Sequence, residues 1–173
     1  EEGIGVAVCS FRKLLSKLSG HFIARQNKYV HISVLLIIKI HIKINQTMNH
    51  SIITSANAPA AIGPYSQATL HNGTMYVSGQ IPLDPQSGEL VSGTIEEETH
   101  QVMKNLFAIL QEAGMGFDNV LKCSIFVKDL NNFGRINETY GSYFTSNPPA
   151  RETVEVSRLP KDVNVEISCI AAK

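Results

Sequence analysis

The stretch TIEEETHQVMKNLFAILQEAGMGFDNVLKCSIFVK, residues 94–128, decides the fold. Its first part predicts an amphipathic helix, because Thr94 and Glu97 form a capping-box pattern and Gly114 ends the periodic segment. One apolar stripe runs along this helix at Val102, Leu106, Ile109, Leu110 and Ala113. The second part alternates apolar and polar residues, which predicts a half-buried strand with Leu121, Cys123, Ile125 and Val127 on its inner face.

The segments on either side of this stretch complete the prediction. Residues 67–70 and 75–78 flank His71-Asn72-Gly73 and predict a hairpin. A second helix, capped by Asn131 or Asn132, is expected to end at Asn147-Pro148-Pro149. Its expected inner face carries Phe133, Ile136, Tyr140 and Phe144. The last two strands are predicted at residues 153–156 and 163–171. Two helices against one face of a mixed sheet give a two-layer α+β domain over residues 48–173.

Residues 1–47 differ in composition from the rest of the chain. They carry seven lysines and arginines against two glutamates, a net charge of +5. The basic stretch suggests a targeting leader, whereas the Ile/Lys/Asn-rich text before Met48 resembles translated non-coding sequence, and a genuine extension is the third alternative. We expect an unstructured N-terminal extension in the first two cases. The apolar run at residues 33–38 is far shorter than the roughly twenty residues of a membrane span, so no membrane association is predicted.

Charge and cysteine content exclude several classes of function. Residues 48–173 carry eight lysines and arginines against thirteen acidic residues, a net charge of −5 that argues against a nucleic-acid partner. Three cysteines, Cys9, Cys123 and Cys169, cannot form a disulfide framework, and free thiols favour a reducing compartment. We therefore expect a cytoplasmic protein, or a mitochondrial one if residues 1–47 are a leader. His21, His31 and His41 match no metal-ligand spacing, and no metal site is predicted.

Few residues are candidates for chemistry. No Walker loop, GxGxxG, HExxH or GxSxG motif is present. Cys123 and Cys169 occupy inward strand positions and are interpreted as buried small side chains rather than catalytic thiols. Arg151 follows a rigid proline pair and could grip a carboxylate bidentately. Glu166 lies on the polar face of the last strand, where a general base could lie. On spacing alone, an ordinary solvated sheet face is the simpler interpretation of both.

Several segments together resemble the reactive-intermediate deaminase (Rid, YjgF-type) family, in particular its RidA branch. The similarity extends from about residue 53 to residue 172. The matching segments are APAAIGPYSQA (58–68), VSGQIPLDPQSGEL (77–90), FVKDLNNF (126–133), INETY (136–140) and PPARETVEVSRLPKDVNVEI (148–167).

The resemblance implies a chorismate-mutase-like fold and a homotrimer with active sites in the clefts between subunits. The implied reaction is hydrolysis of enamines and imines, such as 2-aminoacrylate, 2-iminopropanoate and 2-iminobutanoate, to 2-oxo acids and ammonia. Family members need no metal or bound cofactor. A single arginine can orient so small an anion, and the iminium carbon needs only a positioned water and proton transfer.

The resemblance also implies roles for individual residues. Arg151 resembles the arginine that binds the substrate carboxylate, and Glu166 resembles the acid that positions the attacking water. Residues implied to line the cleft are Tyr65, Ser78, Gly79, Asn137 and Thr153. Thr153 stands where some members have cysteine, and its backbone is the part expected to face the ligand. Pro148 stands where related chains often have phenylalanine, which is expected to alter the rim of the cleft.

Two alternatives from other functional classes stay open at this stage. One is an RNA-directed translation inhibitor or ribonuclease, a role reported for some relatives, which predicts salt-dependent RNA binding. The other is a non-catalytic trimer that binds small ligands or acts like a chaperone, in which Arg151 binds 2-oxo acids and Glu166 has no role in turnover.

Overall fold

A six-stranded sheet with two helices on one of its faces forms the part of the chain that the structure, a computed structural model, describes: residues 50–173. The strands are β1 (Ser51–Ile53), β2 (Ala68–His71), β3 (Thr74–Gln80), β4 (Val120–Val127), β5 (Ala150–Glu155) and β6 (Val165–Ala172). The helices are α3 (Ile95–Glu112) and α4 (Phe133–Gly141), with 3₁₀ turns at Phe117–Asn119, Leu130–Asn132 and Pro160–Asp162. The predictions made for residues 1–47 lie outside the described residues.

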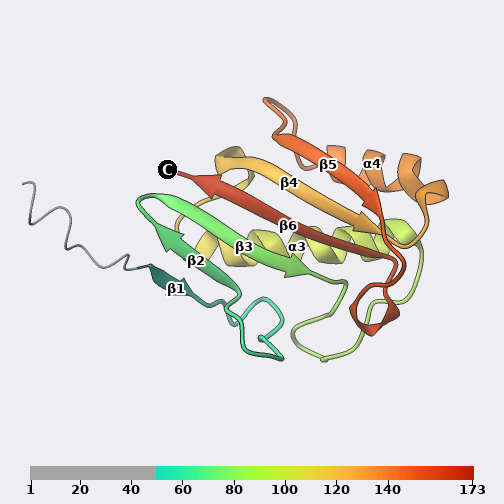
Figure 1. The fold of residues 1–173 in the computed structure, drawn as a ribbon, viewed down its shortest axis with the longest axis horizontal. Coiled ribbons are helices and arrows are strands. Elements are labelled where there is room, and N and C mark those ends of the chain that lie inside the picture. The colour runs from blue at the N-terminus through green and yellow to red at the C-terminus, as the bar shows by residue number, and fades with distance from the viewer. Residues whose placement is uncertain (1–49) are drawn as a thin grey trace, which may run out of the picture. The chain divides into compact units, whose positions relative to one another are not determined.

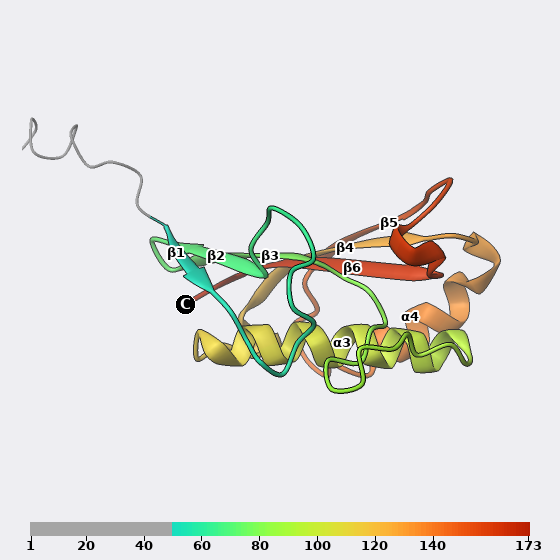
Figure 2. The ribbon, with the colours of Figure 1, turned by 90° about the horizontal axis from the view of Figure 1, so that it is seen from below.

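The order of the strands across the sheet is β1-β2-β3-β6-β4-β5 (Figure 1). β4 and β5 are parallel, and every other neighbouring pair is antiparallel. Figure 2 shows both helices on the same side of the sheet, so no helix within residues 50–173 covers the opposite face. The predicted α+β class, with two helices on one face of a mixed sheet, is therefore confirmed.

Helix α3 begins where the capping box predicted. The backbone nitrogen of Glu97 donates to the Thr94 hydroxyl (3.3 Å), and the backbone nitrogen of Thr94 donates to the Glu97 carboxylate (2.8 Å). Gly114 follows the helix with a φ of 63°, a conformation that favours glycine and ends the helix. The predicted stripe is the buried face: Val102, Leu106, Ile109, Leu110 and Ala113 all lie in the core.

The hairpin of β2 and β3 also follows its local sequence. His71 pairs with Thr74, so the turn has two residues, Asn72 (φ 50°) and Gly73 (φ 79°). Two consecutive left-handed residues are typical of the type I′ turn that Asn-Gly favours. β1 was not predicted. It is a three-residue edge strand paired with β2, too short to show an alternating pattern.

One residue of β4 lies on the opposite face of the strand from the one predicted. Leu121 was expected to point inward, but it is 57% exposed. The pairing with β6 shifts between Val120 and Lys122, so a bulge places Val120 in the core instead. Cys123, Ile125 and Val127 are buried as predicted, and Cys123 is directly paired with the equally buried Cys169 of β6 as free thiols.

The second helix is shorter than predicted. Neither asparagine caps it through its side chain; Asp129 accepts from the backbone nitrogen of Asn131 and caps the 3₁₀ turn that leads into α4. The helix ends at Gly141, before the two prolines, because glycine is a weak helix former and the Ser142 hydroxyl donates to the Thr139 carbonyl. Phe144 still packs against the core, but Phe133 is 40% exposed rather than inward.

No helix within residues 50–173 is long and apolar enough to cross a membrane.

Candidate functional site

Arg151 of β5 points toward helix α4. It is in register with the buried Cys123 of β4, so its side chain lies on the helix-covered side of the sheet. Its Nη1 donates to the Asn137 Oδ1 at 2.7 Å. The guanidinium carbon lies 5.6 Å from the centre of the Phe133 ring and 5.3 Å from that of Tyr140. The structure thus brings two predicted site residues, Arg151 and Asn137, into direct contact.

The positive charge of Arg151 has no acidic partner within residues 50–173. The ion pairs there join Lys122 to Glu152, Lys128 and Arg158 to Asp162, and Arg135 to Glu96. With Nη1 held by a neutral amide, the Nε and Nη2 edge of the Arg151 guanidinium remains available. That edge matches the geometry of a carboxylate, so the arrangement can bind a small organic anion.

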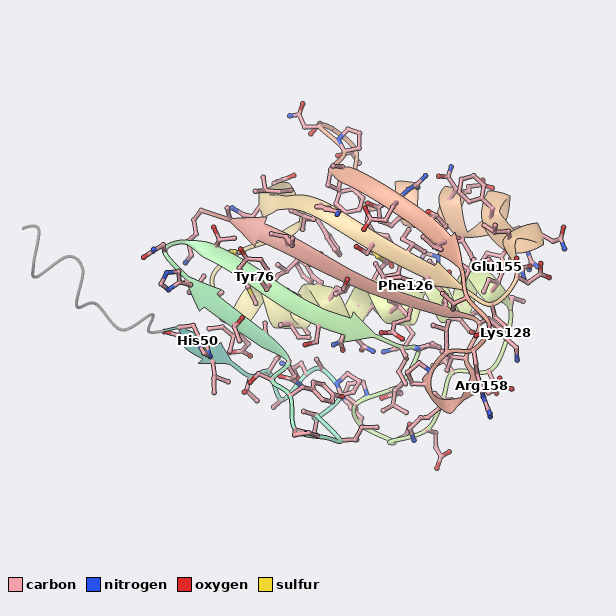
Figure 3. The ribbon with its side chains drawn as sticks, in the orientation of Figure 1. His50, Tyr76, Phe126, Lys128, Glu155 and Arg158 are labelled. Atoms are coloured by element: carbon pink, nitrogen blue, oxygen red, sulfur yellow. The ribbon has the colours of Figure 1, made fainter. Side chains whose placement is uncertain are left out.

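Glu166 of β6 lies on the other side of the sheet. It pairs with Phe126, whose neighbours Ile125 and Val127 point into the core, so Glu166 and Phe126 face away from the helices. Figure 3 looks onto this open face, where Phe126 and Tyr76 are labelled. The Glu166 carboxylate lies directly over Gly79, since a Cβ built on that glycine would overlap with a carboxylate oxygen. Burial raises the pKa of Glu166 above its usual value, because the ionised carboxylate loses part of its solvation.

Tyr65 and Ser78 gather around Gly79. Tyr65 and Gly79 line a shallow hollow of about 30 Å³, and Tyr65 also borders a larger hollow of about 400 Å³ beside β1. The Ser78 hydroxyl donates to the Ser66 carbonyl (2.7 Å), and its backbone nitrogen donates to the Gln67 carbonyl (2.9 Å). These bonds tie β3 to the loop that carries Tyr65. Ser78 therefore has a structural contact in addition to its predicted place at the cleft.

Gln67 was not among the predicted site residues, yet it anchors that loop. Its side chain is buried; it accepts from the backbone nitrogen of Ser55 and donates to the carbonyls of Ser55, Ala58 and Pro59. A buried amide bonded on both sides fixes the loop geometry. In the sequence, Gln67 is a polar residue between a loop and an apolar strand. Because such a residue is also typical of a solvated turn, this position did not predict a buried anchor.

Thr153 and Tyr140 carry buried hydroxyls near Arg151. Thr153 lies two residues after Arg151 on the same side of β5, and neither its hydroxyl nor that of Tyr140 has a hydrogen-bond partner among the described residues. Burial, and then the Cys123 thiol beside it, raises the pKa of Tyr140. The helical spacing of Phe133 and Tyr140 predicted core residues, so sequence reasoning missed that both rings contact Arg151.

The predicted site residues thus form two groups on opposite faces of one sheet. Arg151, Asn137 and Thr153 lie on the helix side near the β5 edge. Glu166 and Gly79 lie on the open face, with Tyr65 and Ser78 beside them. A single protomer does not bring the two groups together. Within residues 50–173, no three His, Cys, Asp or Glu residues lie close enough to hold a metal ion.

Comparison with known proteins places the sequence and the fold in one family. Residues 55–173 match the family model described as Endoribonuclease L-PSP. The 2-iminobutanoate/2-iminopropanoate deaminase of Homo sapiens is 50% identical over 120 residues, covering 69% of this chain and 88% of the human protein. A RutC family protein of Pyrococcus horikoshii is 49% identical over 122 residues, 70% of this chain and 97% of that protein.

Solved structures agree with the sequence relatives. The YjgF gene product of E. coli superposes with a TM-score of 0.69 at 43% identity, covering 71% of this chain and 98% of that one. A putative endoribonuclease of Thermotoga maritima gives a TM-score of 0.70 at 48% identity, covering 71% of this chain and 97% of that one. E. coli TdcF with bound serine gives 0.69 at 39% identity, with coverage of 71% and 98%. The extent and identity of these matches show that the chain belongs to the L-PSP (YjgF/Rid) family and is of the RidA type.

Proposed function

We propose that this protein hydrolyses small reactive imines and enamines of 2-amino acids, such as 2-iminobutanoate and 2-iminopropanoate, to 2-oxo acids and ammonia. The observation that carries the proposal is the Arg151 guanidinium, held by Asn137 with no acidic partner among the described residues. The human relative bears the name of this activity, and E. coli TdcF binds serine, a small amino acid with a carboxylate.

The chemistry divides between the two groups of residues. The Nε and Nη2 edge of Arg151 binds the substrate carboxylate and fixes the position of the adjacent C=N carbon. Glu166 orients a water toward that carbon and accepts one of its protons as the C–O bond forms. Glu166 passes this proton to the imine nitrogen, which gives the carbinolamine. The carbinolamine hydroxyl proton then moves to the amino nitrogen as the C–N bond breaks, so that ammonia leaves and the C=O bond of the 2-oxo acid forms. An enamine substrate first becomes the imine, when a proton moves from its nitrogen to its β-carbon. One water is consumed, and no electrons are exchanged with another molecule.

The proposal requires a second copy of the chain. Since Arg151 and Glu166 lie on opposite faces of the sheet, the Arg151 group of one protomer meets the Glu166 group of another only in an assembly. The homotrimer implied by the family resemblance, with sites between subunits, supplies such a meeting point.

A second candidate is an RNA-directed activity, which the family description and the name of the Thermotoga maritima protein favour. Arg151, in a domain (residues 48–173) with a net charge of −5, is a weaker match to a phosphate backbone than to a small carboxylate. RNA cleavage that persists in purified protein, and binding that falls steeply with salt, would support this candidate over the deaminase.

The assay that tests this proposal produces the short-lived imine enzymatically in the reaction mixture. Threonine dehydratase acts on threonine or serine while semicarbazide competes for the imine, and semicarbazone formation is followed with the full chain present. Wild type is expected to suppress the semicarbazone, and Arg151→Ala to lose at least tenfold of this effect. Arg158→Ala, an exposed arginine outside the two groups, serves as the matched control. Equal suppression by wild type and Arg151→Ala, or none by wild type, would contradict the proposal.

A further inference from the structure

The two aromatic rings beside Arg151 come from one face of helix α4. Phe133 and Tyr140 are seven residues apart, two helical turns, and Asn137 lies between them on the same side. All three contact the guanidinium, which is within 6 Å of both ring centres and hydrogen-bonded to the amide. At these distances, a guanidinium over a ring face is attracted by the ring quadrupole.

The two rings differ in what else they contact. Tyr140 is buried, and its ring lies 4.8 Å from that of Phe144, so it forms a fixed wall. Phe133 is 40% exposed, lies outside the core cluster, and makes no ring–ring contact within residues 50–173. Core packing therefore does not explain a phenylalanine at position 133, whereas its contact with the guanidinium does.

An arginine at the edge of a sheet normally samples many rotamers and loses that freedom when it binds an anion. Contacts with Phe133, Asn137 and Tyr140 restrict Arg151 before any anion arrives. They also occupy the ring-facing surface and the Nη1 side of the guanidinium, which leaves the Nε and Nη2 edge for the ligand.

We infer that Phe133 and Tyr140 are positioning residues that, with Asn137, hold the Arg151 guanidinium ready for a carboxylate and thereby set the affinity of the site for 2-oxo and 2-imino acids. The inference rests on the proposed function only in taking Arg151 as the carboxylate-binding group. It adds a role for the rings of Phe133 and Tyr140, which contact the arginine and no reacting atom.

The experiment measures binding of 2-oxobutanoate by isothermal titration calorimetry, with the neutral 2-oxobutanamide as the comparison ligand. Phe133→Leu is expected to weaken the carboxylate about two- to fivefold, the effect of one partly exposed cation–π contact, and to leave the amide unchanged. Phe133→Trp keeps a ring face and is expected to bind the carboxylate at least as tightly as wild type.

Phe107→Leu is the matched control, because Phe107 is a similarly exposed phenylalanine (38%) on the helix layer that stacks on Phe117 and not on an arginine. It is expected to leave both affinities unchanged. The inference is overturned if Phe133→Leu binds 2-oxobutanoate as wild type does. It is equally overturned if the amide weakens in parallel and Phe133→Trp fails to restore the carboxylate.

The same titration separates this inference from the proposed function. A wild-type protein that binds 2-oxobutanoate but leaves the semicarbazone signal unchanged contradicts the deaminase, while the Phe133 series still decides the role of the rings. A wild-type protein that binds no 2-oxobutanoate overturns the carboxylate site and the positioning residues with it.

Discussion

Gly79 provides the space in which the Glu166 carboxylate lies. We expect Gly79→Ala to displace that carboxylate, because the new Cβ would overlap with its oxygen. The end of a glutamate side chain moves easily, so the fold should survive with a Tm close to that of wild type, while kcat/KM falls on the order of ten- to a hundredfold. Thermal unfolding and the semicarbazone assay measure the two effects.

Gly134→Ala is the control for that substitution. A Cβ at this position of α4 meets no atom within 4 Å. Replacing a helical glycine by alanine should raise stability by about 0.5–1 kcal/mol without loss of activity. Wild-type activity in Gly79→Ala would show that the position of the Glu166 carboxylate is unimportant.

Glu166 also predicts the pH dependence of the reaction. Because burial raises the pKa of this acid, the carboxylate needed to orient water is lost at a higher pH than for an ordinary glutamate. The acidic limb of kcat/KM should therefore lie above about pH 4.5, the pKa of an unshifted glutamate. A limb at or below that value in wild type would contradict the role given to Glu166.

The same shift has a consequence for stability. Because the pKa of Glu166 is higher in the folded than in the unfolded chain, ionisation of Glu166 lowers the free energy of unfolding at pH values above the unfolded pKa. This destabilisation is lost at low pH, where Glu166 is protonated in both states. Glu166→Gln should accordingly unfold at higher urea concentration than wild type near neutral pH. The difference should vanish as the pH falls below the pKa of the unfolded chain.

At the scale of single elements, α3 depends on its capping box. Thr94→Ala removes the hydroxyl that accepts from the Glu97 backbone. We expect a loss of about 1 kcal/mol in the free energy of unfolding and a fall of about 4 °C in Tm. Ser92→Ala, an exposed hydroxyl two residues before the cap, should leave Tm unchanged. Equal Tm values for both variants would contradict the role of the cap.

The contact between the two helices includes a bidentate ion pair. Arg135 donates through Nε and Nη2 to the two Glu96 oxygens at 2.7 and 2.6 Å, and this hydrogen bonding lowers the pKa of Glu96 to about 2. A lowered pKa contributes stability above the unfolded pKa, and that contribution is lost as the pH falls from about 4.5 toward 2.

Arg135→Gln is the variant that tests this pair. Its urea midpoint should be lower than that of wild type at neutral pH, and the two midpoints should converge as the pH approaches 2 or as salt is added. A difference that is constant with pH would assign the effect to packing of the arginine stem rather than to its charge.

At the scale of the whole molecule, the proposed site is divided between two faces of the sheet, which predicts that activity requires an assembly. Arg151→Ala and Glu166→Gln should each be inactive alone. Unfolded together and refolded as a mixture, they should regain about a quarter of wild-type activity, because each site then draws its two halves at random from different protomers. Semicarbazone suppression by the refolded mixture measures this.

The control for complementation is the double variant carrying both substitutions. When the double variant is refolded with Arg151→Ala, no protomer carries an intact Arg151, so no activity should be restored. If the two single variants also restore nothing while a wild-type sample refolds to full activity, the two halves of the site do not meet between protomers.

Local sequence determined much of this protein. The cap of α3, its buried stripe, the Asn-Gly turn and the inward cysteines were predictable, because each depends on residues within a few positions of one another. Arg151 and Glu166 were candidate site residues from their sequence context, and the family resemblance predicted their roles and the other residues of the cleft. Sequence reasoning did not show that a tight fit joins Gly79 to Glu166 or that Phe133 contacts Arg151.

Only the tertiary structure decided the features that depend on which strands are neighbours and in what register. The bulge that turns Leu121 outward, the edge strand β1 and the anchoring of the Tyr65 loop by Gln67 all arise from pairing between distant segments. The placement of Arg151 and Glu166 on opposite faces has the same origin. A strand alternates its side chains with a period of two, so the face of each residue is fixed only once its register is fixed, and long-range packing sets that register.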